Sequence, residues 1–258
     1  MKVGDEYRIQ TEESAAWRDE FLSQRSALSN EAHRIEAERD DRMRKLFGEM
    51  VRKLSLTQGT SKVTREVHPV FDPQLPNDAD QRICVWVRDG WSIDENSVLA
   101  DSWQAGNQSP TVFVFIPKRS ADDLRHYLID YKAASATLDK RPVPNTPEGT
   151  EARAAMETTK QTAEGKIREL LEEAFSGARV FQGGGNEILG NDLQEMVLEA
   201  SGNALQRLYP QFHTADHVGW SKVYEKAQKG APDALKAVGD EGEPAKNPVC
   251  KAILGFIA

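Results

Sequence analysis

The sequence lacks the features that mark a membrane or a secreted protein. It has only two cysteines, Cys84 and Cys250, which lie far apart and form no Cys-x-x-Cys pair. This favours reduced thiols in a cytosol over a disulfide framework. No run approaches the roughly 20 apolar residues that cross a bilayer, and the first residues do not resemble a signal peptide. We therefore predict a soluble, cytoplasmic chain.

An excess of positive charge is also missing. The chain has 33 Lys and Arg against 41 Asp and Glu, a formal net charge of −8 at pH 7, so its averaged field repels a phosphate backbone. The basic run Arg42–Lys45 lies beside Asp40 and Asp41, a mixture typical of a solvated helix face. A DNA-binding module that uses these basic residues stays open as an alternative, with salt-dependent DNA binding as its signature.

The three glycines Gly183–Gly185 are not followed by a phosphate-binding signature. A Walker A loop needs Gly-Lys-Ser/Thr, in which the lysine neutralises phosphate charge and the hydroxyl binds magnesium. Here Asn186 follows the last glycine. We predict a hairpin turn at this position.

The pair His213 and His217 has the four-residue spacing of two ligands on one helix face. No further ligand is evident nearby, and Pro210 and Thr214 place the start of a helix only near Asp216. We therefore predict no metal site and interpret Asp216 as an N-cap residue.

Two residues at strand ends are the remaining candidates for phosphate chemistry. Asp89 ends an apolar run as a Walker B aspartate would, but without a P-loop it is more simply part of a turn. Arg119 follows another apolar run, where α/β sheets commonly bind ligands, and could contact a phosphate supplied by another domain. No Ser-His-Asp or Cys-His set can be argued from spacing, so we predict no catalytic residue and no enzyme activity for this chain.

Proline and glycine are scarce in two long segments. Between residues 12 and 56 there is no proline and only Gly48, which predicts a long helix with a narrow apolar seam; a break near Ser29 and Asn30 or at Gly48 is the alternative. A second long helix is predicted at about residues 148–175. We expect the two to pair as an antiparallel hairpin, or else to lie separately on a sheet as amphipathic helices.

Between these helices the hydrophobic pattern changes to that of strands. Strands are predicted in 63–71, 83–87 and 111–116, the last two as buried runs that are each followed by a helix. This order favours a small α/β layer with at least one parallel pair. Beyond the second long helix we predict a strand, a glycine turn and a strand within 178–191, followed by helices at about 192–208, 218–229, 232–238 and 248–256.

The predicted fold class is α/β (α+β mixed), with a small sheet and flanking helices, a long helical arm or hairpin, and a mainly helical C-terminal lobe. The predicted divisions are an α/β lobe at 1–140 that includes the long helix 12–56, a proline-rich linker at 141–149, a second long helix at 150–177 that pairs with the first, and a hairpin plus helical lobe at 178–258.

The chain ends on the apolar run Pro248–Ala258, which has no polar tail. Each large hydrophobe left in water there would cost about 1.5–3 kcal/mol. We therefore expect this chain to be a piece of a longer protein, truncated at its C-terminus.

Several segments resemble an interior section of the large P-loop ATPases of bacteriophage exclusion (BREX) systems, the BrxC/PglY family. They are Glu6–Trp17, Val112–Pro117 with the helix after it, Gly219–Tyr224 and Asn247–Leu254. The resemblance extends over essentially the whole chain but covers only a fraction of such a protein, and none of these segments is a catalytic motif.

The resemblance implies a part of a bacterial antiphage system. In it the full-length ATPase works with a DNA methyltransferase and other components, to modify host DNA and to exclude phage. The family's nucleotide-binding loop has no counterpart here, so ATP and magnesium are implied for the parent protein only. We expect a non-catalytic region that acts in assembly, with system components or by self-association. A composite ATP site completed by Arg119 or Asp89 across a domain boundary is the alternative.

Overall fold

The computed structural model describes residues 2–3, 6–7, 12–60, 62–77 and 82–216. The chain divides into two compact units. The helical unit comprises the described residues up to Glu49 together with Ile116–Ala178, and the sheet unit comprises Met50–Phe115 and the described residues from Arg179 onward. The mixture of helices with a five-stranded mixed sheet confirms the predicted α/β fold class. These units do not follow the four predicted segments. The predicted lobe 1–140, for example, is divided, because its two ends belong to the helical unit and its middle, Met50–Phe115, belongs to the sheet unit.

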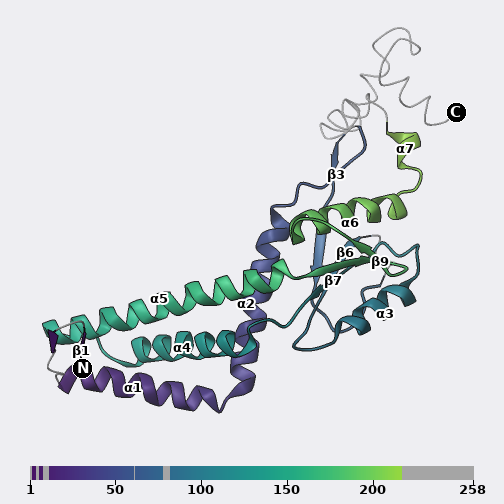
Figure 1. The fold of residues 1–258 in the computed structure, drawn as a ribbon. Coiled ribbons are helices and arrows are strands. Elements are labelled where there is room, and N and C mark those ends of the chain that lie inside the picture. The colour runs from purple at the N-terminus through teal and green to yellow at the C-terminus, as the bar shows by residue number, and fades with distance from the viewer. Residues whose placement is uncertain (1, 4–5, 8–11, 61, 78–81, 217–258) are drawn as a thin grey trace, which may run out of the picture. The chain divides into compact units, whose positions relative to one another are not determined.

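Four helices build the helical unit: α1 (Glu12–Ser29), α2 (Ala32–Arg52, of which the last three residues belong to the sheet unit), α4 (Ala121–Lys140) and α5 (Pro147–Ser176). Helix α4 packs against both α1 and α5 (Figure 1). Its side toward them carries the small buried residues Ala133 and Ala134, which let the helices approach closely.

The prediction of one long helix at 12–56 is wrong, because the helix breaks between Ser29 and Ala32. The side chains of Ser29 and Asn30 donate hydrogen bonds to the backbone oxygens of Arg25 and Ser26, at 2.8 and 3.2 Å. Such local bonds compete with the regular helical pattern. The break is at the first of the two places considered from the sequence, and Gly48 lies inside α2.

The second long helix is confirmed as α5, with its start inside the predicted linker 141–149. Thr146 is its N-cap and accepts a hydrogen bond from the amide of Gly149 at 3.1 Å, while Pro147 occupies the first turn, where a missing N–H costs nothing. Only residues 141–146 connect α4 to α5, so α5 returns alongside α4. The predicted pairing of the two long helices is present as contacts of α5 with α1 and, at Phe47 and Phe175, with α2, although α4 is the larger neighbour of α5.

The central sheet has the order β5 (Val67–Val70), β6 (Ile83–Asp89), β7 (Val112–Ile116), β8 (Arg179–Gln182) and β9 (Asn186–Ile188). Strands β5 and β6 are parallel, which confirms the predicted parallel pair, and β8 is antiparallel to both β7 and β9. Two further antiparallel pairs are β1 (Lys2–Val3) with β2 (Glu6–Tyr7), and β3 (Thr57–Gln58) with β4 (Val63–Thr64).

Helices α3 (Glu95–Ala105) and α6 (Leu193–Leu208) cover opposite faces of this sheet (Figure 1). The core that includes Val98 of α3 contains Trp86, Phe113, Phe115 and Phe181. Side chains between these positions point to the other face, because neighbours along a strand alternate. Burial on both faces explains why these strands are continuous apolar runs in the sequence.

The predicted element ends of the sheet unit are largely confirmed. Asp94 and Asp192 are N-caps of α3 and α6, and each carboxylate accepts a backbone hydrogen bond three residues on, from Ser97 at 2.9 Å and Glu195 at 2.8 Å. The glycine segment forms the predicted hairpin turn between β8 and β9.

The last described helix is α7 (Phe212–Ala215). The helices predicted at 218–229, 232–238 and 248–256 lie outside the described residues. None of the helices in the described ranges has the length and apolar character needed to cross a membrane.

Candidate interaction cleft

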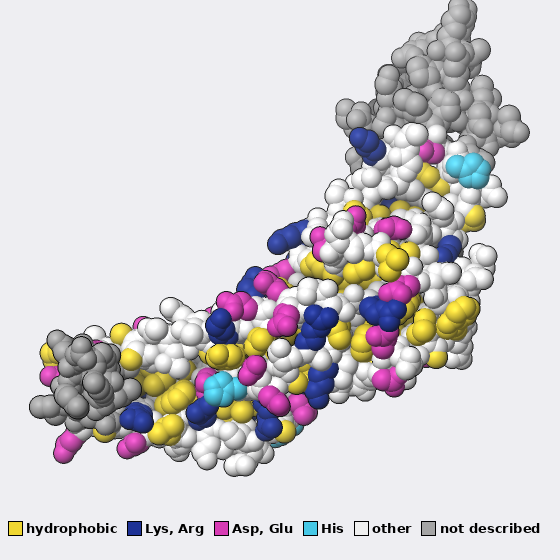
Figure 2. Space-filling view, in the orientation of Figure 1, with side chains coloured by type: hydrophobic (Ala, Val, Ile, Leu, Met, Phe, Trp, Pro, Cys, Tyr) yellow, Lys and Arg dark blue, Asp and Glu magenta, His cyan; other side chains and the backbone are white. Residues whose placement is uncertain are grey.

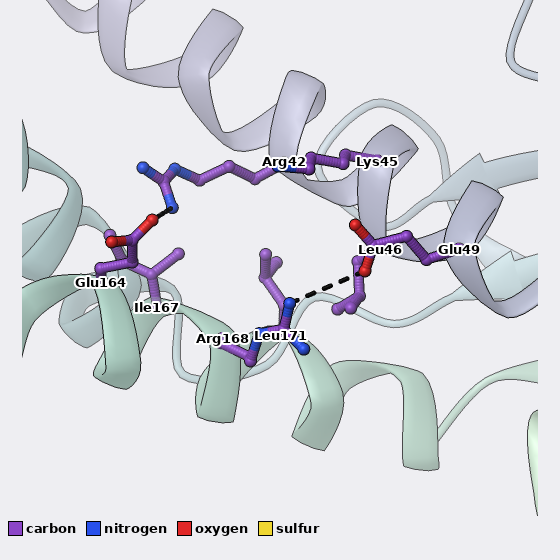
Figure 3. A pocket seen from close by; sticks show the side chains of 8 residues that line it. All are labelled: Arg42, Lys45, Leu46, Glu49, Glu164, Ile167, Arg168 and Leu171. Carbon is purple, nitrogen blue, oxygen red and sulfur yellow. Dashed lines mark ion pairs between the residues drawn. The ribbon is translucent and has the colours of Figure 1, made fainter. Parts of the chain in front are cut away.

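A cleft opens between α2 and α5 of the helical unit (Figure 3). Its lining residues recur three and four apart on each helix, so each set occupies one helix face. Helix α2 contributes Arg42, Lys45, Leu46 and Glu49, and helix α5 contributes Glu164, Ile167, Arg168 and Leu171.

The floor of the cleft is apolar. Ile167 and Leu171 are buried, at 1% and 2% exposure, while Leu46 is half-buried and points toward them from α2. Phe47, the next residue of α2, meets the ring of Phe175 edge to face at a centroid distance of 6.1 Å. This aromatic contact holds α2 against α5, so the floor rests on a packed scaffold.

The rim of the cleft is charged. Two ion pairs span it, Arg42 Nη1 to Glu164 Oε1 at 3.8 Å and Arg168 Nη2 to Glu49 Oε2 at 3.7 Å (Figure 3). Both distances exceed hydrogen-bonding range, and such partly exposed pairs contribute little to stability. Lys45 is exposed and makes no ion pair with any carboxylate in the part of the chain that the structure describes.

A tighter ionic cluster next to the cleft joins α2 to α4. The carboxylate of Glu38 accepts hydrogen bonds from Arg42 at 2.7 Å and from Lys132 at 2.8 Å. The Arg42 guanidinium also lies 4.1 Å from the centroid of the Tyr131 ring. Burial disfavours the Glu38 charge, but the hydrogen bonds from Lys132 and Arg42 outweigh it and lower the pKa of Glu38 below its ordinary value.

Replacing Glu38 by glutamine is expected to lower the free energy of unfolding at pH 7 by about 1 kcal/mol, since the lost bonds are charged but partly screened by water. A lowered folded-state pKa means that the charge of Glu38 stabilises the fold above its ordinary pKa. That contribution is lost as the pH falls through the lowered value.

Urea denaturation of both proteins between pH 7 and pH 3 measures this difference. It should shrink as the medium becomes acidic, whereas a difference that is constant with pH would contradict the role given to the ionised carboxylate. Glu169→Gln is the matched control, because Glu169 is exposed and pairs with Lys166 three residues away on α5.

The predicted phosphate contact Arg119 lies elsewhere in the helical unit. It is exposed, and its guanidinium lies against Gly177 at the end of α5, where a Cβ would come within 2.7 Å of Nε. A cation near a helix C-terminus is favourable because the helix dipole is negative there. The position of Arg119 thus has a structural explanation, and the phosphate contact stays a prediction.

The strand-end carboxylate Asp89 is part of a turn, as predicted. Its Oδ1 accepts hydrogen bonds from the amides of Trp91 at 2.9 Å and Ser92 at 3.2 Å. The local turn therefore accounts for this aspartate.

The histidine pair is only half described. His213 lies in α7 with its Nδ1 3.0 Å from the backbone oxygen of Pro210, and His217 lies outside the described residues. The helix predicted to begin near Asp216 lies outside the described residues. Helix α7 ends just before Asp216, whose carboxylate accepts a 3.0 Å hydrogen bond from Thr60 Oγ1. Among the described residues, no group of three or more His, Cys, Asp or Glu side chains is placed to hold a metal ion.

The cleft was missed at the level of the sequence. Leu46 falls within the predicted long helix 12–56 and Ile167 within the second one, and their apolar side chains are the signal that the sequence offers. Whether these two residues face each other depends on how α2 crosses α5. In the sequence alone, Lys45 and Arg168 cannot be distinguished from ordinary solvent-exposed charged residues.

Comparison of the chain with protein-family models, with curated proteins and with solved structures found no match. Function is therefore inferred from the residues of the chain and from the resemblance described above.

Proposed function

We propose that this chain is a non-catalytic interior part of a BREX ATPase of the BrxC/PglY family. In this proposal it acts in assembly, by binding other components of the antiphage system, such as the DNA methyltransferase, or another copy of itself. The resemblance of the segments quoted above supports the family. The observation that supports an assembly role is the α2–α5 cleft, an accessible hollow with an apolar floor and a charged rim.

The arrangement of the cleft suits binding. Protein interfaces typically combine a buried apolar anchor with a polar rim. The floor residues Ile167 and Leu171 and the rim residues Lys45 and Arg168 supply both parts, and all four project from helices that hold their positions. In this proposal ATP and magnesium are bound by other parts of the parent protein, and the assembly is cytoplasmic.

The charge distribution gives less support to DNA binding. Lys and Arg side chains are intermixed with Asp and Glu side chains over the visible face of the helical unit (Figure 2). A phosphate backbone favours a continuous basic surface instead. The composite ATP site is also less favoured, because Arg119 lies against the end of α5.

The proposal predicts that the purified chain forms a complex at micromolar concentration with a separately purified BREX component or with itself. Size-exclusion chromatography and sedimentation velocity measure it, with an unrelated acidic protein of similar mass as the control. Turnover of ATP by the chain alone should stay at the level of a buffer blank. A chain that remains monomeric and alone in every mixture would refute the assembly role.

A further inference from the structure

We propose that the exposed indole ring of Trp103, in the sheet unit, binds a basic side chain of a partner segment through a cation–π contact. This surface is separate from the α2–α5 cleft. The inference rests on the proposed assembly role and adds the chemistry of a partner. It is carried by the way in which the glycine turn holds the ring and by the negative charge around it.

The indole of Trp103 lies flat on a glycine. The C-terminal end of α3, which carries Trp103, lies beside the turn between β8 and β9 (Figure 1). Trp103 is 63% exposed, although tryptophan is usually buried over most of its surface. A Cβ at Gly185 would come within 2.7 Å of three indole atoms, Cε2, Nε1 and Cδ2. A point in the ring plane at these distances would overlap other ring atoms, so the backbone of Gly185 lies against the flat face of the ring.

The glycine turn is tied to α3. The amide of Gly184 donates a 2.8 Å hydrogen bond to the backbone oxygen of Ser102, the residue before Trp103. Gly185 has a φ of +74°, a left-handed conformation that favours glycine, and a side chain there would also displace the ring. The turn therefore supports one face of the indole and leaves the opposite face to solvent.

The charge around Trp103 is negative. No Lys or Arg occurs between Asp89 and Lys118. Helix α3 with its N-cap, the loop after it and the β8–β9 hairpin contain four carboxylates, those of Asp94, Glu95, Asp101 and Glu187. Two guanidinium groups lie among these elements. Arg179 is shared by two of the carboxylates, and Arg207 of α6 donates a hydrogen bond to the backbone oxygen of Ser109 in the loop. An excess of two negative charges remains, and it attracts a basic segment.

The free face of the indole suits a cation. The quadrupole of an aromatic ring is negative over its face, so a Lys or Arg group within about 6 Å of the centroid is attracted, most strongly by tryptophan. The side chains of Gln104, Asn107 and Asn186, next to Trp103 and to the turn in the sequence, are polar and exposed. Trp103 is thus not the centre of a broad apolar interface. Arginine fits best, because its planar guanidinium stacks on an aromatic face.

Asp101 offers a carboxylate to a second basic residue. It makes no ion pair with any Lys or Arg side chain in the part of the chain that the structure describes. Side chains two positions apart on a helix do not face each other, so a cation stacked on Trp103 cannot also bond to Asp101. The segment that fits this surface therefore has at least two basic residues.

The test uses the full chain, labelled with nitrogen-15, and a capped, fluorescein-labelled peptide of sequence Gly-Arg-Gly-Arg-Gly at about 0.15 M salt. Fluorescence anisotropy measures the affinity, and NMR signals of the indole N–H groups locate the site. We expect saturable binding in the range of roughly hundreds of micromolar. The Trp103 signal should shift, while those of Trp17 and Trp86, which are 2% exposed, should not. No binding, or a shift only at another tryptophan, would overturn the inference.

A peptide with citrulline in place of arginine tests the need for charge. Citrulline has nearly the shape of arginine but is uncharged, so the affinity should fall at least fivefold. Equal binding of the two peptides would show that the surface accepts an uncharged side chain, and the inference would be wrong.

The variant Trp103→Leu tests the need for the ring. Leucine keeps an apolar side chain on α3 but has no π face, so the affinity for the arginine peptide should fall at least fivefold. Leu75→Ala is the matched control, because Leu75 is an apolar side chain of the same unit that is 42% exposed. It should change the affinity less than twofold. Equal losses in both variants would refute the role of the ring.

The variant Gly185→Ala tests the support beneath the ring. The added Cβ displaces the indole while Trp103 itself is kept, so the affinity should fall at least threefold. Combining it with Trp103→Leu should cause no loss beyond that of Trp103→Leu alone. Unchanged affinity in a Gly185→Ala chain with the circular dichroism of the parent would contradict the inference. If this variant is unfolded, the citrulline peptide and Trp103→Leu decide.

The inference can fail while the proposed function stands. If the chain forms a complex with a BREX component and Trp103→Leu binds that component as tightly as the parent chain does, assembly uses another surface and the inference is wrong. If no complex forms with any component or between copies, the assembly role fails, whereas the peptide titration still decides whether Trp103 binds a basic side chain.

Discussion

Replacing Trp86 by alanine is expected to lower the free energy of unfolding of the sheet unit by about 3–5 kcal/mol, the usual range for deleting a large buried aromatic side chain. Trp86 is 2% exposed and lies in the core between the sheet and α3. Its ring meets that of Phe113 edge to face at 5.8 Å, and its Nε1 donates a 2.8 Å hydrogen bond to the backbone oxygen of Asp72. The substitution removes the packing and the shorter of two hydrogen bonds to that oxygen, which Arg88 Nη1 also contacts at 3.4 Å.

Trp103 supplies a matched control for this prediction. It belongs to α3 of the same unit but is 63% exposed, so Trp103→Ala should cost less than about 1 kcal/mol. Urea denaturation followed by circular dichroism compares the two variants. Similar losses of stability would mean that Trp86 is not part of a packed core.

Replacing Trp17 by alanine is expected to destabilise the helical unit by a similar amount, about 3–5 kcal/mol. Trp17 is 2% exposed and packs from α1 against Ala134 of α4 and Met156 of α5. The substitution leaves a cavity. The methyl side chain of Ala134 is too short to fill it, so the structure can relax only in part.

Hydrogen exchange measures this effect where it should occur. The amides of α4 and α5 should exchange faster in Trp17→Ala, whereas Leu22→Ala, at a position of α1 that is 44% exposed, should leave them nearly unchanged. Unaltered protection of α4 and α5 in the Trp17 variant would show that α1 does not support them. The cleft depends indirectly on this packing, because its α5 wall is held from the other side by α4 and α1.

Much of the local structure could be predicted because it depends on nearby residues. The run Ile83–Val87 is recognisable as a buried strand since β-branched and aromatic residues follow one another without a polar break. Asp192 marks the start of α6 because its carboxylate binds an amide three residues away, a contact that exists as soon as the turn forms.

The errors involve contacts between distant residues. The helix break at Asn30 is stabilised from a different element, since Arg125 of α4 donates a 2.9 Å hydrogen bond to the backbone oxygen of Ser29. The first long helix was predicted to be the main partner of α5 because both carry apolar stripes. An apolar stripe indicates that a helix face is covered, but it does not indicate which element covers it.

The candidate site likewise combines features that depend on nearby residues with features that depend on distant ones. The sequence by itself determined the helices, the strands and the caps, because short-range sterics and hydrogen bonds act within a few residues. Only the tertiary structure decided that Lys45 and Arg168 share a cleft, since their proximity follows from packing α2 across α5 around Phe47 and Phe175. Hydrophobic burial is not directional, so any of several apolar faces could cover a given stripe favourably. The shapes of the side chains select among these possible partners.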